Sequence, residues 1–114
     1  MLESCFFACT VENAVRFNSD LSTWSVGRVT DMGYMFRGAS AFNADISSWQ
    51  VGAVEDISYM FNSATSFNQD LCQWGLRLDS STLASEAFEF SACQRVEDPN
   101  FAATPPGPFC FVCN

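Results

Sequence analysis

Phenylalanine recurs at a fixed interval of 25 residues along the first two thirds of this chain, and three other residue types keep the same step. The four columns are Phe17, Phe42 and Phe67; Asn18, Asn43 and Asn68; Asp20, Asp45 and Asp70; and Trp24, Trp49 and Trp74. A period in this range is typical of proteins in which each repeat buries its apolar side only against its neighbours. The period therefore predicts a solenoid of stacked coils.

Two apolar patterns divide each 25-residue unit. Trp24-Ser25-Val26 alternates apolar and polar residues, which predicts a short strand. Further along, apolar residues fall at helix spacing, and the second unit repeats them. These helix-spaced residues are Met32, Met35, Phe36 and Ala39, then Ile57, Met60, Phe61 and Ala64. The sequence thus predicts the α/β class: a short solenoid with one short strand and one short helix per coil.

The register divides a single domain into five parts. They are a degenerate N-terminal part-coil (1–16), coil 1 (17–41), coil 2 (42–66), coil 3 (67–93) and a Pro/Cys-rich C-terminal cap (94–114). We expect a two-residue insertion near Leu78–Ser81 in coil 3. In the part-coil, we align Leu2, Cys5, Phe6 and Cys9 with the helix-spaced set of coil 1. An uncovered front coil would make Leu2, Phe6 and Phe7 interface candidates.

Six cysteines in a short chain predict disulfides and an oxidising compartment. The candidates are Cys5, Cys9, Cys72, Cys93, Cys110 and Cys113. Six cysteines allow about fifteen pairings, and the sequence does not choose among them. A zinc site at Cys110-Phe-Val-Cys113 is the competing interpretation, although no His and no second close CxxC pair accompany it. We expect the tail to fold over the last coil and to be held there by a disulfide.

The termini and hydropathy bear on localisation. No run approaches the ~18 apolar residues of a membrane span, so we expect no transmembrane segment. The start lacks the pattern of a signal peptide, which conflicts with disulfides. We therefore expect a mature form or a piece of a longer precursor, located outside the cell or on its surface; the alternative is the lumen of an oxidising organelle.

The net charge of −8, with Arg as the only basic residue type, narrows the partners. An acidic surface repels nucleic acid and anionic membranes. The absence of His and Lys removes the common bases that activate a Ser or Cys nucleophile, so we predict no enzyme activity and no cofactor.

Each polar or aromatic column has two interpretations. Asp20, Asp45 and Asp70 could bind Ca²⁺ through oxygen ligands, but Asp in a turn usually accepts a backbone N–H bond. The Asn column could contact a ligand, but an internal ladder that satisfies backbone groups is favoured. The Trp column could stack on sugars, but its inward phase with Val26, Val51 and Leu76 favours a core position.

The string FNxDLSxWxVxxVTDMxxMFxxA, at residues 17–39, resembles the repeats of BspA-like surface proteins and, more closely, those of mycoplasma surface lipoproteins. Two segments, DLCxWG at 70–75 and PGPFCxxC at 106–113, are similar to algal versions. The resemblance implies a leucine-rich-repeat-like solenoid that is secreted or exposed at a surface.

These features together predict a non-catalytic module for protein–protein interaction, adhesion or structural assembly. Such a module would be an accessory or scaffold subunit, and its partners would be other subunits or further repeats of the same kind. The alternative is a module that binds glycan or calcium. The exposure of the Trp and Asp columns would discriminate between the two.

Overall fold

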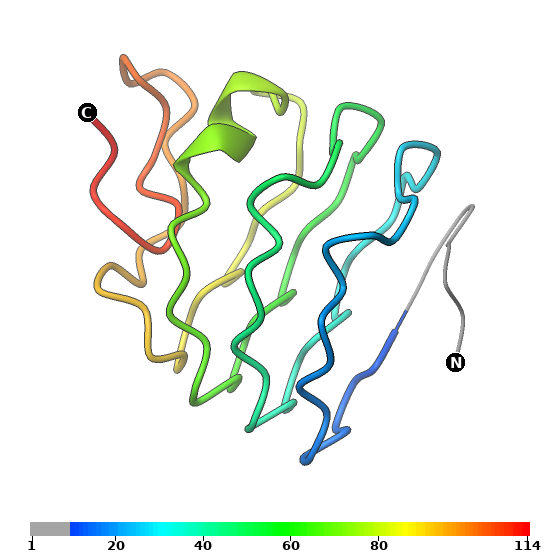
Figure 1. The fold of residues 1–114 in the computed structure, drawn as a ribbon. Helices are drawn as coiled ribbons and strands as arrows, with labels where there is room; N and C mark the ends of the chain where they lie inside the picture. The colour runs from blue at the N-terminus through cyan, green and yellow to red at the C-terminus, as the bar shows by residue number, and fades with distance from the viewer. Residues whose placement is uncertain (1–9) are drawn as a thin grey trace.

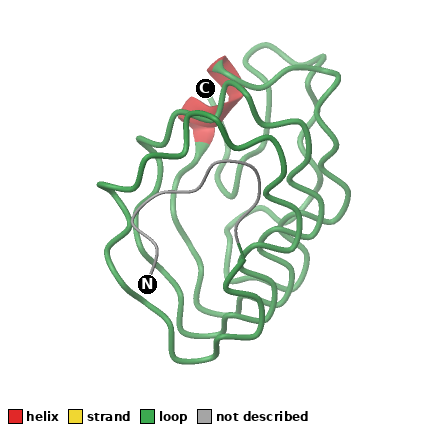
Figure 2. Ribbon diagram, turned by 90° about the vertical axis from the view of Figure 1, so that its right-hand side faces the viewer, coloured by secondary structure: helices red, strands yellow, loops and turns green. Residues whose placement is uncertain are grey.

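The fold was analysed in a computed structural model that describes residues 10–114 (Figure 1). Within that range there is one helix, the 3-10 helix η1 (Cys72–Leu76), and there are no multi-residue strands. The isolated β-bridges are Asp31–Asp56, Asp56–Leu83, Asn100–Gly107 and Phe109–Phe111. The predicted α/β solenoid is therefore wrong, since neither its strands nor its helices form. Figure 2 shows that loops and turns make up almost all of residues 10–114.

Backbone hydrogen bonding between segments explains why the helix-spaced residues form no helix. The N–H groups of Met32, Phe36 and Gly38 donate to carbonyls of the following segment at 2.8–2.9 Å. In a helix these groups would donate four residues back along the same segment. Tyr34 and its counterpart Tyr59 also have left-handed φ angles of 62° and 59°, which no α-helix accommodates. Successive turns nevertheless point the apolar residues inward.

We call residues 31–38, 56–63 and 83–90 the bridge wall, because their backbones bond directly to one another. The spacing of these bonds confirms the expected insertion. Phe36 N–H donates to the carbonyl of Met60, 24 positions on, whereas Phe61 N–H donates to that of Ala87, 26 positions on. The two extra residues lie between Trp74 and Leu83.

The same ladder corrects the register proposed for the part-coil. Val11 N–H donates to the Met35 carbonyl at 2.8 Å, with the same spacing that Phe36 N–H shows toward Met60. Val11 therefore occupies the position equivalent to Phe36, 25 residues before it. The alignment of Phe6 with Phe36 would instead have required five extra residues between this position and Phe17. Phe6 itself lies outside the described residues.

Aromatic columns fill the space between the walls. Phe36 stacks on Phe42 with ring centroids 4.0 Å apart, and Phe61 stacks on Phe67 at the same distance. Phe36 also stacks on Phe61 at 5.5 Å, which links one segment to the next. Buried aromatic pairs contribute more than their apolar area alone. The core therefore runs as a continuous aromatic stack along the molecule.

The Trp column belongs largely to this core. Trp49 and Trp74 are 2% and 0% exposed, which confirms the predicted core position for these two, and Trp24 is half-buried. Leu76 was expected to point inward with Val26 and Val51, but it is 78% exposed. It lies at the end of η1, whose tighter winding breaks the alternation that Trp24-Ser25-Val26 has.

The C-terminal tail closes the rear end of the stack. Disulfides join Cys72 to Cys113 and Cys93 to Cys110. They confirm the disulfide prediction for these four residues and rule out the zinc interpretation, because thiolate ligands are lost on oxidation. Cys5 and Cys9 lie outside the described residues.

Phe109 provides the apolar contact of this cap. It is fully buried, lies edge-on to Phe88 with centroids 6.5 Å apart, and its carbonyl accepts a bond from Leu71 N–H. The tail is thus attached to the preceding segments through two disulfides and through the packing of Phe109.

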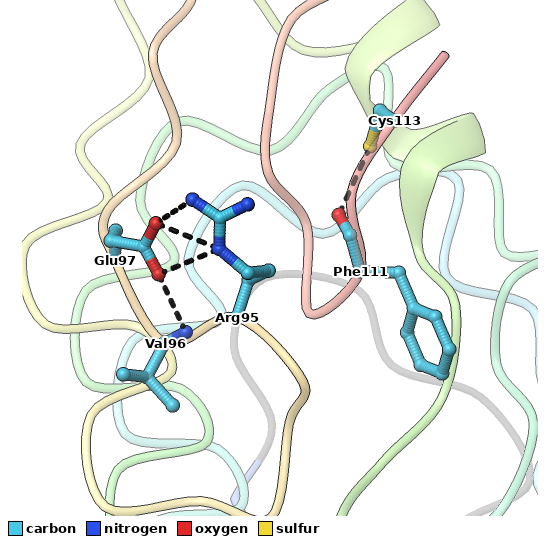
Figure 3. Close-up of polar contacts among 5 residues, drawn as sticks. All are labelled: Arg95, Val96, Glu97, Phe111 and Cys113. Atoms are coloured by element: carbon cyan, nitrogen blue, oxygen red, sulfur yellow. Dashed lines mark hydrogen bonds and ion pairs between the residues drawn. The ribbon is translucent and has the colours of Figure 1, made fainter.

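Figure 3 shows polar contacts among residues of the tail. Glu97 accepts hydrogen bonds from the Arg95 guanidinium and from Val96 N–H. The Arg95 hydrogen bonds lower the pKa of Glu97 to about 2. The Cys113 sulfur lies 3.5 Å from the Phe111 carbonyl oxygen.

Among residues 10–114, no helix has the length and apolar character needed to cross a membrane.

Candidate functional site: the side-chain wall and its open front

Residues 17–24, 42–49 and 67–74 form a second wall, opposite in character to the first. Asn43 N–H donates to Asn18 Oδ1 at 2.8 Å, and Asn68 N–H donates to Asn43 Oδ1 at the same distance. We call this surface the side-chain wall, because side-chain groups supply the bonds between its segments. The predicted Asn ladder is confirmed, except that its members are exposed rather than internal.

We call the contact between two neighbouring segments of the side-chain wall a junction. A tryptophan side chain supplies the second hydrogen bond of each junction. Trp49 Nε1–H donates to the Leu21 carbonyl at 3.0 Å, and Trp74 Nε1–H donates to the Ile46 carbonyl at 3.2 Å. Because both indoles are buried, these bonds satisfy donors that would otherwise be costly to desolvate.

Phenylalanine supplies the third contact. Phe17 and Phe42 stack with centroids 5.9 Å apart, and Phe42 and Phe67 with centroids 5.7 Å apart. Each junction of the side-chain wall thus repeats one amide bond, one indole bond and one ring stack. The front side of each segment presents donors, and its rear side presents acceptors.

The Asp column lines the outside of this wall. Asp20, Asp45 and Asp70 each accept the backbone N–H two residues on, at 2.9 Å, as the turn interpretation expects. The backbone bonds from Ser22 and Ser47 lower the pKa values of Asp20 and Asp45.

Shallow grooves lie between these carboxylates. The larger, of about 500 Å³, lies between the first two segments, and its lining includes Asn18, Asp20, Asn43, Asp45 and Ser47. Within residues 10–114, no three acidic, His or Cys side chains lie close enough together to hold a metal ion. The column gives calcium binding no converging ligand set.

The front segment, residues 17–24, is the least covered part of the wall. Phe17 and Trp24 are half-buried, whereas their counterparts in the next two segments are at most 2% exposed. Neither Asn18 N–H nor Trp24 Nε1–H has an acceptor among residues 10–114. The front segment therefore presents a ring and two donors of the kind used at each junction behind it.

A surface on the bridge wall escaped the sequence analysis. Tyr34 and Tyr59 stack at 5.0 Å, the Arg37 guanidinium lies 5.8 Å from the Tyr34 ring centre, and the Tyr59 hydroxyl donates to Glu86 at 3.0 Å. The hydrogen bond and negative charge of Glu86 raise the pKa of Tyr59. The sequence signal for this surface is the recurrence of Tyr-Met-Phe after 25 residues. Met and Phe of this triplet match a helical core pattern, and the sequence analysis assigned no role to Tyr.

The interface residues chosen from the sequence, Leu2, Phe6 and Phe7, lie outside the described residues. The front that the structure does describe is formed by Phe17, Asn18 and Trp24, which the sequence analysis assigned to internal columns. Their exposure follows from being first in each column.

Comparison with known proteins gives one result. No curated protein and no solved structure matches this chain. The disulfides fit an extracellular or otherwise oxidising environment. The family described as "Mycoplasma protein of unknown function, DUF285" matches residues 6–99, which is most of the chain, and the chain therefore belongs to that family.

Proposed function

We propose that this protein is a non-catalytic module that binds other proteins, and that it acts in adhesion or structural assembly as an accessory or scaffold subunit. The observation that supports this is the difference between the two ends of the stack. The rear is covered by Phe109 and held by two disulfides, whereas the front presents half-buried Phe17 and Trp24. Aromatic residues are enriched at protein interfaces.

The chemistry of the acidic residues supports a non-catalytic role. A general acid needs a raised pKa to hold its proton near neutral pH. The pKa values of Asp20 and Asp45 are instead lowered by backbone hydrogen bonds, so these groups remain ionised. The chain also has no His or Lys to act as a base.

The alternative of glycan or calcium binding has less support. Two of the three tryptophans are inside the core and cannot stack on a sugar. Each carboxylate of the Asp column is engaged by its own turn. We therefore place the partner surface at the front segment.

The disulfides favour a position outside the cell or on its surface, with the lumen of an oxidising organelle as the alternative. We propose a relationship to BspA-like and algal surface proteins on the motifs at residues 17–39, 70–75 and 106–113. A surface location would give an adhesion or assembly module access to its partners.

The test is the native mass of the endogenous protein, measured by light scattering after gentle extraction. We expect a mass well above that of one chain, with other polypeptides present. Introducing Phe17→Asp should reduce the mass to that of one chain. Leu76→Ser, an exposed apolar residue outside the front segment, should leave the complex intact. A lone monomer would overturn the proposal, as would a complex that survives Phe17→Asp.

A further inference from the structure

We propose that the front segment binds, from another polypeptide, an extended stretch of the form Phe-Asn-x-x-Leu or Phe-Asn-x-x-Ile. This inference rests on the proposed function and specifies the chemistry of the partner. The receiving groups are the Phe17 ring, Asn18 N–H and Trp24 Nε1–H.

The molecule contains two occupied examples of this junction. In the first, Phe17, Asn18 and Leu21 cover the front of the second segment: the rings stack at 5.9 Å, Asn18 Oδ1 accepts from Asn43 N–H at 2.8 Å, and the Leu21 carbonyl accepts from Trp49 Nε1–H at 3.0 Å.

The second junction repeats the arrangement with new residues. Phe42, Asn43 and Ile46 cover the front of the third segment, with distances of 5.7, 2.8 and 3.2 Å for the same three contacts. An aromatic ring, a carboxamide and a carbonyl three residues later therefore form a unit that fits the donor side of any segment with Phe, Asn and Trp in this register.

The front segment has Phe17, Asn18 and Trp24 at the same spacing. Among residues 10–114, no ring, carboxamide and carbonyl cover its donor side. Asn18 is exposed, Phe17 and Trp24 are half-buried, and neither donor has an acceptor in this range. A partner that supplies the three groups would satisfy both donors and bury both rings. Burying these donors without acceptors would cost binding free energy, which selects against segments that lack the Asn oxygen.

The Asp between Asn and the apolar residue is not required for the contact. At both observed junctions its carboxylate is turned to its own backbone, two residues on. The contact therefore sets no requirement for an acidic residue at the x positions of the partner.

A second copy of this chain is a poor source of the stretch. The acceptor sides of its first two segments are occupied by the segments behind them. The rear of its third segment adjoins the tail, where Leu71 N–H bonds to Phe109 and Cys72 is joined to Cys113. A second copy of residues 10–114 is therefore not the expected source of the stretch.

The third segment indicates how binding could be strengthened. Gln69 Nε2 donates to both the carbonyl and the Oδ1 of Asn43, at 2.9 and 3.0 Å. The front segment has Ser19 at the equivalent position. Ser19→Gln should therefore add bonds to the Asn of an incoming stretch and tighten its binding.

The experiment adds a synthetic peptide of residues 42–52 to the ¹⁵N-labelled full chain and follows the three indole N–H signals by NMR. Trp24→Phe assigns the front indole. We expect saturable shifts of the Trp24 indole and Asn18 amide signals, with Trp49 and Trp74 unchanged. A control peptide carrying Asn43→Leu keeps the size but loses the acceptor, and it should bind about tenfold more weakly. Ser19→Gln should bind the unmodified peptide more tightly.

An absence of shifts, or equal shifts with both peptides, overturns the inference. If the endogenous complex depends on Phe17 but the peptide does not bind, the inference fails and the proposed function stands. If the peptide binds selectively while the endogenous protein is a monomer, the chemistry of the front segment is supported and the assembly role fails. Self-association of the labelled chain without peptide would identify a second copy as the partner and would also overturn the inference.

Discussion

The two walls of this protein are built from the same 25-residue period but are held together by different groups. In the bridge wall, backbone N–H and carbonyl groups bond from segment to segment, as between Met32 and Asp56. In the side-chain wall, Asn and Trp side chains make the bonds, as between Asn18 and Asn43. Identity at particular positions therefore matters most in the side-chain wall, and backbone conformation matters most in the bridge wall.

A substitution in the core, where the two walls meet, should give the largest loss of stability. Phe61 is fully buried and contacts Phe36, Phe67 and Phe88 in ring stacks. Phe61→Ala should lower the free energy of unfolding by about 3–5 kcal/mol, as for other buried Phe truncations. Urea denaturation measures this. A loss below about 1 kcal/mol would show that the walls hold without the aromatic stack.

The indole hydrogen bonds test whether side-chain groups hold the side-chain wall together. Trp49→Phe keeps an aromatic ring but leaves the Leu21 carbonyl without its buried donor. We expect a loss of about 1–3 kcal/mol. Trp24→Phe is the matched control and should cost less, because Trp24 is half-buried and its indole donates to no described residue. Equal losses would argue against the indole hydrogen bond.

A backbone test applies to the bridge wall. Gly38 has φ 73°, and a Cβ there would lie 2.2 Å from Asn13 Oδ1, so Gly38→Ala should cost about 1–2 kcal/mol. The equivalent Ser63 has φ 62°, and Ser63→Gly should change stability by less than about 1 kcal/mol, in the stabilising direction. Thermal unfolding of both variants measures these changes. A Gly38→Ala variant more stable than the parent would contradict the claim that the backbone at position 38 requires glycine.

The Asn ladder gives a smaller effect with a built-in control. Asn43 Oδ1 accepts from Asn68 N–H, so Asn43→Ala should cost about 1 kcal/mol. Asn43→Asp retains an acceptor and should cost less. Asn68 is the last of its column, and its side chain accepts no bond from residues 10–114, so Asn68→Ala should be near neutral.

Acidification should weaken the side-chain wall only modestly. Because the folded-state pKa values of Asp20 and Asp45 lie below the unfolded value of about 3.9, both carboxylates stabilise the fold above that pH. This stability is lost as the pH falls through the folded-state values. The Tm should therefore decline below about pH 4, and Asp45→Asn should reduce the decline. An identical pH profile for the variant would remove Asp45 from the explanation.

The difference between the walls also explains which features the sequence predicted. The Asn ladder, the buried Trp49 and Trp74 and the disulfides of the tail depend on particular side chains, so their residue types and spacing indicated them. The bridge wall depends on backbone bonds between segments, which any residue can make. Its inward apolar residues at offsets 0, 3, 4 and 7 match a helix, so the pattern predicted helices that do not form.

The candidate site was only partly predictable for a related reason. Phe17, Asn18 and Trp24 were recognised as column members, but the exposure of the first member depends on what covers it, which periodicity does not specify. The Tyr34 and Tyr59 surface was missed because turns with left-handed φ angles direct these rings outward. No Gly or Asn stands at these two positions to indicate a left-handed turn in the sequence.

The two extra residues between Trp74 and Leu83 show where this architecture tolerates variation in length. Both walls keep their contacts on either side of that insertion. The corresponding connections in the earlier segments include Gly27 and Gly52, where an added Cβ would meet no non-neighbouring atom within 4 Å. Because loop closure costs grow slowly with length, foreign sequence grafted after Gly27 or Gly52 should leave the stack unchanged. Grafted peptides would then be displayed at two connections, each of which joins the side-chain wall to the bridge wall.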